Sequence, residues 1–204
     1  MKILNLYSCI GGNRKLWGDN HEITSVEIVP EIAKIYKEYY PNDKIVVGDA
    51  HEYLLEHYKE FDFIWASPPC PSHSDIRRCG VHSGQYKAIY PDMKLYEEII
   101  FLTHFAKKET NWVVENVKPY YKLLIPALER GRHLFWSNFF IPEYNKKDKR
   151  KHDDITGNST VYGYNLTKYN IKNKRKILRN MVDPDLALHV LNSAMGKSNQ
   201  LTFF

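Results

Sequence analysis

Short apolar runs alternate with amphipathic stretches over the first 120 residues of the chain. The apolar runs predict strands at residues 2–8, 21–28, 45–47, 61–66 and 112–115. Apolar positions at helical spacing predict the intervening helices, at residues 31–40, 51–58 and 92–108. Residues 71–90 are polar and predict a long loop. Strands separated by helices indicate an α/β fold with a doubly wound parallel sheet.

The pattern changes after residue 130. Residues 134–141 predict one more strand, and Asp183-Pro184 predicts the start of a last helix that ends near residue 194. The segment between them, 143–176, is polar and basic, and we expect it to be irregular. Residues 143–179 hold eleven Lys or Arg and four acidic residues, whereas the whole chain has a net charge of +5. Such local basicity is typical of a polyanion contact or of a solvated loop, and composition does not separate the two.

Length and composition favour a single globular domain. The chain has 204 residues, of which 43% are hydrophobic, and no apolar run approaches the roughly 20 residues that a membrane span needs. The N-terminal sequence lacks the pattern of a signal peptide, and three cysteines argue against a disulfide framework. We therefore expect a cytoplasmic protein with free thiols and no contact with a membrane.

Three features at predicted strand ends suggest an adenosine-binding site. A glycine turn, Gly11-Gly12, follows the first strand, and glycine lets a ligand approach the backbone. Glu27 ends the second strand, where a carboxylate can accept hydrogen bonds from ribose hydroxyls, and Asp49 follows the third, where it can accept from an adenine amino group. This trio does not separate S-adenosylmethionine from a dinucleotide, although the missing G-x-G-x-x-G spacing argues against the latter.

The next two strands end in residues that could carry chemistry. Ser67-Pro68-Pro69-Cys70 ends the fourth strand, and a thiol presented there could act as a nucleophile, or it could be a small buried side chain. Glu115 ends the fifth strand and could act as a general acid beside the thiol. Two guanidinium groups, Arg130 and Arg132, could hold a base oxygen or a phosphate, or lie on the surface.

Taken in order, these segments resemble the motifs of the DNA cytosine-5 methyltransferase family. Seven segments carry the resemblance: Tyr7 to Gly12, Glu27, Gly48-Asp49, Pro69-Cys70, Glu115-Asn116-Val117, Arg130-x-Arg132 and Asn180-Met181-Val182-Asp183-Pro184. They span the chain from about residue 4 to about residue 192. The resemblance implies the doubly wound, Rossmann-like α/β sheet of the class I S-adenosylmethionine-dependent methyltransferases. It also implies a catalytic domain of residues 1–142 and 177–204, with 143–176 as a basic insert that forms a much reduced DNA-recognition region, as in small phage-type members.

The resemblance also implies a reaction. A methyl group passes from S-adenosylmethionine to carbon 5 of a cytosine that is flipped out of double-stranded DNA. Cys70 adds to carbon 6, Glu115 assists charge development at ring nitrogen 3, and Arg132 holds the base oxygen with Arg130 in support. A base then removes the carbon 5 proton, and Cys70 leaves by elimination.

Further site residues follow from the same resemblance, and no metal ligand is among them. The expected cofactor contacts are Tyr7, Ser8, Cys9, Ile10, Gly11, Gly12, Glu27, Ile28, Asp49, Ala50, Pro69, Asn180 and Val182. The expected DNA contacts are Ser72, His73, Ser74, Arg77, Arg78, Asn116, Lys174 and Arg175.

The chain departs from the family pattern at several places. Cys9 stands where the family has glycine, Pro71 replaces the Gln after the catalytic Cys, and Leu128 replaces the Gln before the arginine pair. Only about 40 residues separate the arginine pair from the last motif, in place of a long recognition domain. We therefore expect short or relaxed sequence readout, or completion of DNA recognition by a partner protein or by self-association.

Four alternatives stay open at this point. Ser67-Pro68-Pro69 also fits methyltransferases that act on an exocyclic amino group, N4 of cytosine or N6 of adenine, although Cys70 replaces their aromatic residue. Two Cys-x-x-His pairs, Cys70 with His73 and Cys79 with His82, are chemically suited to structural zinc. The chain could also be an inactive DNA-binding relative, or RNA could be the substrate.

Overall fold

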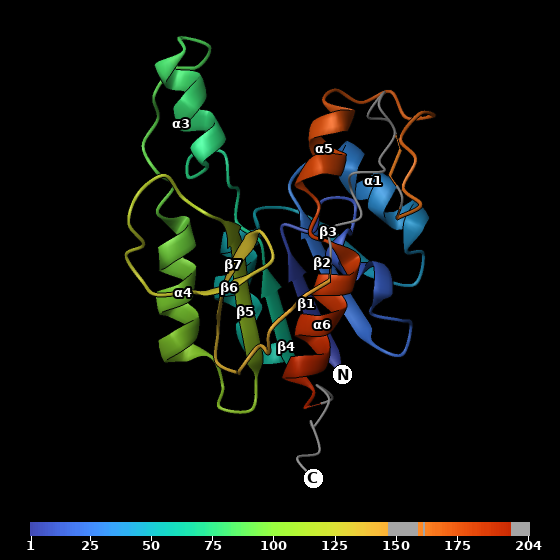
Figure 1. Cartoon of the computed structure of the whole chain (residues 1–204). Helices are drawn as coiled ribbons and strands as arrows, with labels where there is room; N and C mark the ends of the chain where they lie inside the picture. Colours follow the sequence, from blue (N-terminus) through green and yellow to red (C-terminus); the bar gives the residue numbers. More distant parts are fainter. Residues whose placement is uncertain (147–158, 161, 197–204) are drawn as a thin grey trace.

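A seven-stranded mixed sheet forms the centre of the molecule (Figure 1). The computed structural model describes residues 1–146, 159–160 and 162–196. The strand order is β3-β2-β1-β4-β5-β7-β6. The strands are β1 Lys2–Leu6, β2 Glu22–Glu27, β3 Lys44–Val47, β4 Phe63–Ala66, β5 Asn111–Val117, β6 Leu128–Arg130 and β7 His133–Ser137.

The expected parallel sheet is confirmed for strands β1 to β5. The far edge differs, because β7 runs antiparallel to both β5 and β6. A turn of Gly131 and Arg132 joins β6 to β7, and a two-residue connection of this kind can only produce antiparallel neighbours. The turn brings the beginning of β7 beside the carboxyl end of β5, with His133 opposite Val117.

Helices cover both faces of the sheet. They are α1 Pro30–Tyr39, α2 Ala50–His57, α3 Asp75–His82, α4 Lys94–Phe105, α5 Lys174–Asn180 and α6 Pro184–Ala194, with short 3-10 turns η1 Asn13–Leu16 and η2 Tyr58–Glu60. Alternate strand residues point to opposite faces, as the pleat requires. Leu4, Ile64 and Val114 pack with α2 and α4, whereas Phe63 and Val113 pack with α6. The doubly wound architecture expected from the sequence is therefore confirmed.

Three predictions about local structure are wrong. The expected loop 71–90 contains α3, whose first turn is capped by Ser74 Oγ accepting from Arg77 N. Residues 143–176 were expected to be irregular, but α5 begins at Lys174, and no helix was expected before the one that starts at Asp183-Pro184. Strand β6 was not expected. Only Gly80 is buried in α3 and only Leu178 in α5, so neither helix has the apolar stripe by which a surface helix is recognised.

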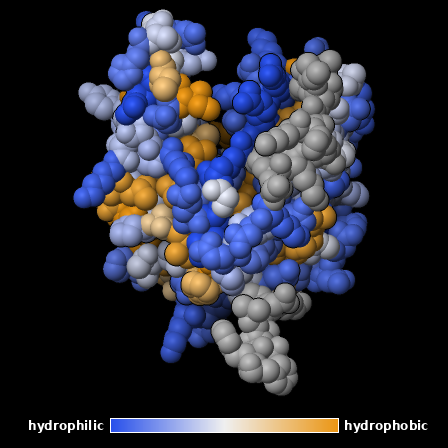
Figure 2. Space-filling view, viewed as in Figure 1, coloured by the Kyte–Doolittle hydropathy of each residue, from blue (hydrophilic) through white to orange (hydrophobic). Residues whose placement is uncertain are grey.

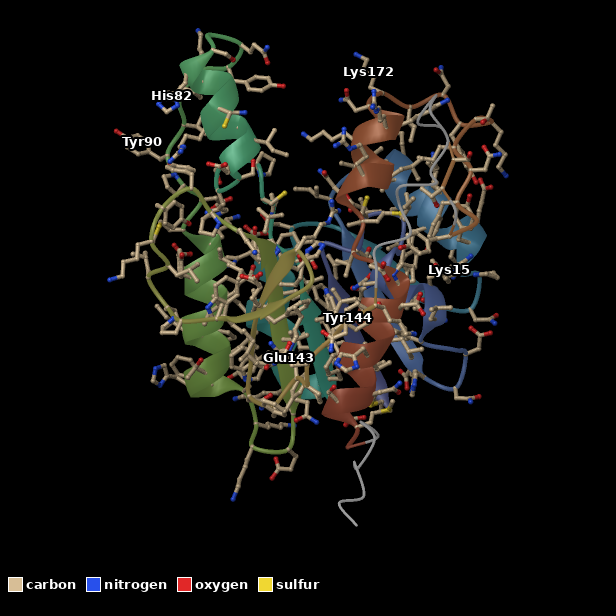
Figure 3. All side chains as sticks on the ribbon, in the orientation of Figure 1. Lys15, His82, Tyr90, Glu143, Tyr144 and Lys172 are labelled. Atoms are coloured by element: carbon tan, nitrogen blue, oxygen red, sulfur yellow. The ribbon has the colours of Figure 1, made fainter. Side chains whose placement is uncertain are left out.

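Two arms rise above the edge of the sheet at which the parallel strands end (Figure 1). One arm is α3 with its flanking turns, and the other contains α5 and the segment that precedes it. In the space-filling view they stand apart with a notch between them (Figure 2). Figure 3 places His82 and Tyr90 on the α3 arm and Lys172 at the top of the α5 arm.

Among the described residues, no helix combines the length and the apolar character that crossing a membrane requires.

Candidate active site

The turn after β1 is built around the Glu27 carboxylate. Cys9 N donates to Glu27 Oε2 at 3.0 Å, and Val29 N donates to Oε1 at 2.8 Å. The turn is tight, since φ is +58° at Tyr7 and +49° at Cys9, values that side chains seldom adopt. Burial raises the pKa of Glu27, and the backbone N–H groups of Val29 and Cys9 oppose that rise. The Glu27 carboxylate at the end of β2 thus holds the turn, and each of its oxygens still has a lone pair that can accept a hydrogen bond from a ligand.

Two glycines of this turn are required by the protein's own side chains. At Gly11, φ is +82°, and an added Cβ would lie 2.4 Å from Tyr40 Cε2. At Gly12, an added Cβ would lie 2.7 Å from Met181 Cβ. The sequence suggested that ligand approach explains these glycines, but close packing by Tyr40 and Met181 already does so.

Asp49 caps helix α2 at the end of β3. Its Oδ1 accepts from His51 N at 2.8 Å, and its Oδ2 pairs with Lys94 Nζ at 3.2 Å. Backbone N–H groups and Lys94 hold the pKa of Asp49 below its ordinary value, although burial opposes them. Ala50, the next residue, is buried as the first residue of the helix. The partnership with Lys94 was not predicted.

The buried Glu98 carboxylate, below the turn, was also not predicted from the sequence. Glu98 on α4 has a fully buried side chain, and it accepts from the Tyr7 hydroxyl and pairs with His51 Nδ1 at 3.1 Å. Its Oε2 has no hydrogen-bond partner in the described structure. Burial raises the pKa of Glu98. The signal was available, because Glu98 interrupts the apolar stripe of α4 formed by Leu95, Ile99 and Leu102.

The last expected motif meets the first. Met181 contacts the Gly12 position, and Val182 is buried in the core beneath it, while Asn180 at the end of α5 stays exposed. Of the remaining expected cofactor residues, Ser8 and Ile10 are buried within the turn. Ile28 and Pro69 are exposed beside it. The residues predicted from distant parts of the chain therefore gather at one edge of the sheet.

Cys70 follows β4 at the same edge, half-buried. Its carbonyl accepts from His73 N at 3.0 Å and from Ser74 N at 3.1 Å, which curls the chain immediately after the thiol. Asn116 Nδ2 donates to Pro68 O at 3.0 Å and ties this loop to the end of β5.

Charged groups from three elements act on the Cys70 thiol. Burial is the main cause that raises its pKa, and the Glu115 carboxylate raises it further. Lys176 of α5 and Arg132 of the β6–β7 turn oppose this shift. The resting thiol is thus protonated, with cations placed to stabilise a thiolate.

Glu115 belongs to a chain of hydrogen bonds that runs from the core to the exposed Arg132. His133 Nδ1 bonds Glu115 Oε1, and the two side chains are 4% and 6% exposed. Arg132 Nε donates to His133 Nε2 at 3.2 Å, and Arg132 Nη2 donates to Arg179 O at 2.9 Å. His133 was not predicted as a site residue, although it directly follows the arginine pair.

Arg130 is engaged inside the protein. It is buried, and its Nε and Nη2 donate to the Ile141 carbonyl at 3.0 Å and 2.6 Å. Its Nη1 pairs with Glu143 at 3.2 Å. The Arg130 side chain therefore anchors the segment that follows β7. Of the two arginines, Arg132 is the one that lies nearer to the Cys70 thiol and the Glu115 carboxylate.

The residues expected to contact DNA divide into two groups. Ser72, His73 and Asn116 are buried and bonded within the protein, so in this structure they are not presented to a ligand. The other five lie on the two arms: Ser74, Arg77 and Arg78 on or beside α3, and Lys174 and Arg175 on α5.

The zinc alternative gains no support. Within the described ranges, which include all four Cys and His residues of the two pairs, no three of His, Cys, Asp and Glu group in a way that could hold a metal ion.

A protein-family comparison decides the assignment. The model of the C-5 cytosine-specific DNA methylases matches residues 1–122, more than half of the chain and all of the edge from the glycine turn to Glu115. The chain belongs to the C-5 cytosine-specific DNA methylase family. Membership of this family makes the chain a methyltransferase of the class I fold with S-adenosylmethionine as its methyl donor. No curated protein matches the sequence.

Solved structures similar to this chain include other methyltransferases. The hypothetical protein TTHA0928 of Thermus thermophilus is 15% identical, with a TM-score of 0.44 over 67% of this chain and 73% of that one. The methyltransferase EhMeth of Entamoeba histolytica is 16% identical, with a TM-score of 0.38, and the match covers 57% of this chain and 38% of that one. A SAM-dependent methyltransferase of Agrobacterium tumefaciens is 14% identical, with a TM-score of 0.43, and the match covers 59% of this chain and 40% of that one. The chain thus spans less than half the length of the last two, and the assignment rests on the family match.

The donor set at this edge fits S-adenosylmethionine. The buried Glu27 carboxylate and the capped Asp49 carboxylate lie at the ends of adjacent strands, as acceptors for ribose hydroxyls and for an amino group. The exposed side chain of Asn180 lies at the end of the helix whose next residue packs on Gly12. These residues would hold the donor next to the loop that carries Cys70.

Proposed function

We propose that this methyltransferase acts on carbon 5 of cytosine in double-stranded DNA, with Cys70 as a covalent nucleophile. The observation that carries the proposal is the pairing of Cys70 and Glu115 at the ends of neighbouring strands. Strands β4 and β5 are in parallel register, and the Glu115 carboxylate acts on the Cys70 thiol. Attack by a thiol on an aromatic ring requires an acid close by to receive the displaced charge.

The first step forms a bond between Cys70 Sγ and carbon 6 of the base. The Glu115 carboxylate first takes the thiol proton. The sulfur then supplies the electron pair, the ring electrons move toward nitrogen 3, and Glu115 passes the proton to that nitrogen. Arg132 and Lys176 favour the thiolate that this step requires. Loss of aromaticity makes carbon 5 nucleophilic.

S-adenosylmethionine would supply an electrophilic methyl group to the electron pair at carbon 5 and would leave as S-adenosylhomocysteine. After carbon 5 has been methylated, its proton passes to a base, the C–H electron pair restores the ring double bond, and the C6–S bond breaks. Cys70 leaves as a thiolate, nitrogen 3 returns its proton to Glu115, and Glu115 returns it to the thiolate. Cys70 is therefore regenerated in each turnover.

The two arms support double-stranded DNA as the substrate. Arg77 and Arg78 lie on one arm, and Lys174 and Arg175 on the other, so both arms that border the notch in Figure 2 carry cations. Phosphate contacts of this kind give affinity that depends on salt but carry little sequence information. Residues 147–158, which hold further lysines of the basic insert, lie outside the described residues.

Product analysis tests the proposal. Duplex DNA is incubated with the protein and isotopically labelled S-adenosylmethionine, then digested to nucleosides for mass spectrometry. We expect label in 5-methylcytosine and none after Cys70→Ala. Label in N4-methylcytosine or N6-methyladenine, or undiminished methylation by Cys70→Ala, would contradict it. A parallel reaction with RNA of the same sequence separates the two nucleic acids.

A further inference from the structure

His133 lies between two residues that the proposed reaction uses, yet it has no role in that reaction so far. It is the first residue of β7, and its side chain is 4% exposed. One ring nitrogen bonds Glu115, and the other accepts from Arg132. Burying a histidine with both nitrogens bonded fixes its ring orientation strongly.

These contacts determine the tautomer of His133. A guanidinium N–H can only donate, so His133 Nε2, at 3.2 Å from Arg132 Nε, is an acceptor and carries no proton. The proton of the neutral ring is therefore on Nδ1, where it points at Glu115 Oε1. Glu115 thus receives a donor on one oxygen, which leaves Oε2 as the oxygen available to a base.

The same contacts fix the spacing between Arg132 and Glu115. Arg132 stands in the tight turn after β6, and Glu115 stands on β5, so the backbone alone does not lock their side chains together. The imidazole spans the gap with one hydrogen bond at each end. A second bond, from Arg132 to the Arg179 carbonyl, connects this chain of contacts to α5.

We propose that His133 is a positioning residue for cytosine methylation: its imidazole directs Glu115 Oε2 at nitrogen 3 of the base and sets the distance from Glu115 to Arg132. This inference rests on the function proposed above. It concerns the orientation of a catalytic group, which affects the chemical step more than it affects donor binding.

Two substitutions separate the hydrogen bond from the volume of the ring. His133→Phe keeps an aromatic ring of similar size and removes both bonds. His133→Asn places an amide N–H near the position of Nδ1 and can still donate to Glu115. His189→Phe is the matched control, because His189 is a partly buried histidine that bonds the Pro142 carbonyl at 3.0 Å and lies on α6, away from the thiol.

The measurements are kcat and KM for S-adenosylmethionine on duplex DNA, with thermal unfolding to follow the fold. We expect His133→Phe to lower kcat about 100-fold, with KM for the donor within about threefold of wild type. His133→Asn should recover activity to within about tenfold of wild type, and His189→Phe should keep wild-type kcat. If His133→Phe fails to fold, the kcat of His133→Asn decides alone.

Three results would overturn the inference. The first is a His133→Phe enzyme with wild-type kcat. The second is a loss by His133→Asn as large as that of a folded His133→Phe, because Asn keeps the donor to Glu115 and an equal loss would show that this hydrogen bond does not carry the effect. The third, where His133→Phe does not fold, is a folded His133→Asn whose kcat falls more than about tenfold. A wild-type protein that methylates no cytosine would instead overturn the proposed function, and the inference with it.

Discussion

At the scale of single residues, two opposing effects act on the pKa of the Cys70 thiol. Burial and Glu115 raise the pKa of Cys70, whereas Lys176 and Arg132 lower it. A buried thiol that stays protonated at rest is protected from adventitious oxidation, and nearby cations lower the cost of the thiolate when substrate arrives. The reactivity of Cys70 therefore depends on its neighbours.

Lys176 offers a test of this dependence. Replacing it with Gln removes a cation that stabilises the thiolate, so the pKa of Cys70 rises further and less thiolate is present at neutral pH. Because Lys176 is exposed and screened by solvent, we expect adduct formation at pH 7 to slow only about two- to fivefold. The pH-rate profile should move toward higher pH.

Lys172→Gln is the matched control, since Lys172 is exposed on the same arm (Figure 3) and is not among the charges that act on Cys70. Identical pH profiles for the two variants would show that Lys176 has no influence on the thiol.

At the scale of elements, part of the basic insert packs firmly on the cofactor turn. The Tyr164 side chain is fully buried, and its hydroxyl donates to the Gly11 carbonyl at 2.7 Å. Tyr40 donates to the same carbonyl at 3.0 Å. Lys168 of the insert pairs with Glu38 on α1 at 2.7 Å. The insert thus also holds the turn that forms the proposed site of the methyl donor.

Changes at Tyr164 should therefore affect both stability and donor binding. Tyr164→Ala leaves a cavity and should lower the free energy of unfolding by about 3–5 kcal/mol. Tyr164→Phe removes the hydroxyl and should cost about 1 kcal/mol, with donor affinity about three- to tenfold weaker because the turn is held less firmly. Denaturant unfolding and calorimetric titration with S-adenosylmethionine measure the two effects.

Tyr169→Phe provides the comparison, because its hydroxyl bonds the exposed Glu38 rather than the turn. It should cost less than about 0.5 kcal/mol and leave donor affinity unchanged. Equal donor affinities for Tyr164→Phe and wild type would contradict the link between insert and turn.

The order of the elements was predictable because strands and helices of the main sheet bury long apolar faces. Strands β1 to β5 and helices α1, α2, α4 and α6 lie within a few residues of their predicted ranges. Helix α6 begins where Asp183-Pro184 predicted, with Asp183 accepting from Asp185 N and Leu186 N. By contrast, α3 and α5 bury almost nothing, and β6 has only three residues, so periodicity could not reveal them.

The site was predictable in part for the same reason. Residues at strand ends share one edge of a parallel sheet, so the sequence alone predicted that Glu27, Asp49, Cys70 and Glu115 lie at the same edge. Side-chain partners from elsewhere in the chain leave no such pattern. The contacts that His133 makes depend on the antiparallel direction of β7. The hydrogen bonds that hold Arg130 inside the protein depend on backbone carbonyls after that strand, such as that of Ile141.

At the scale of the whole molecule, the arms form the candidate DNA-binding surface. Replacing Lys174 and Arg175 together with Gln should weaken binding to duplex DNA about tenfold and reduce the salt dependence of binding by about one counterion for each residue. Fluorescence anisotropy at several salt concentrations measures both quantities.

Lys107 and Lys108 lie between α4 and β5, at the opposite edge of the sheet, and serve as the control pair. Their replacement by Gln should leave DNA affinity and the salt slope unchanged. A loss of affinity equal to that of the arm variant would show that binding follows net charge rather than the surface above Cys70.

Trapping the covalent adduct is the sharpest test of Cys70 as the nucleophile. Duplex DNA carrying 5-fluorocytosine is mixed with the protein and S-adenosylmethionine, since fluorine at carbon 5 cannot leave as a proton and elimination stops. We expect a denaturation-resistant protein–DNA complex that forms with wild type and is absent with Cys70→Ala. A wild-type protein that binds the donor and methylates cytosine but leaves no such complex, or a complex that persists in Cys70→Ala, would contradict it.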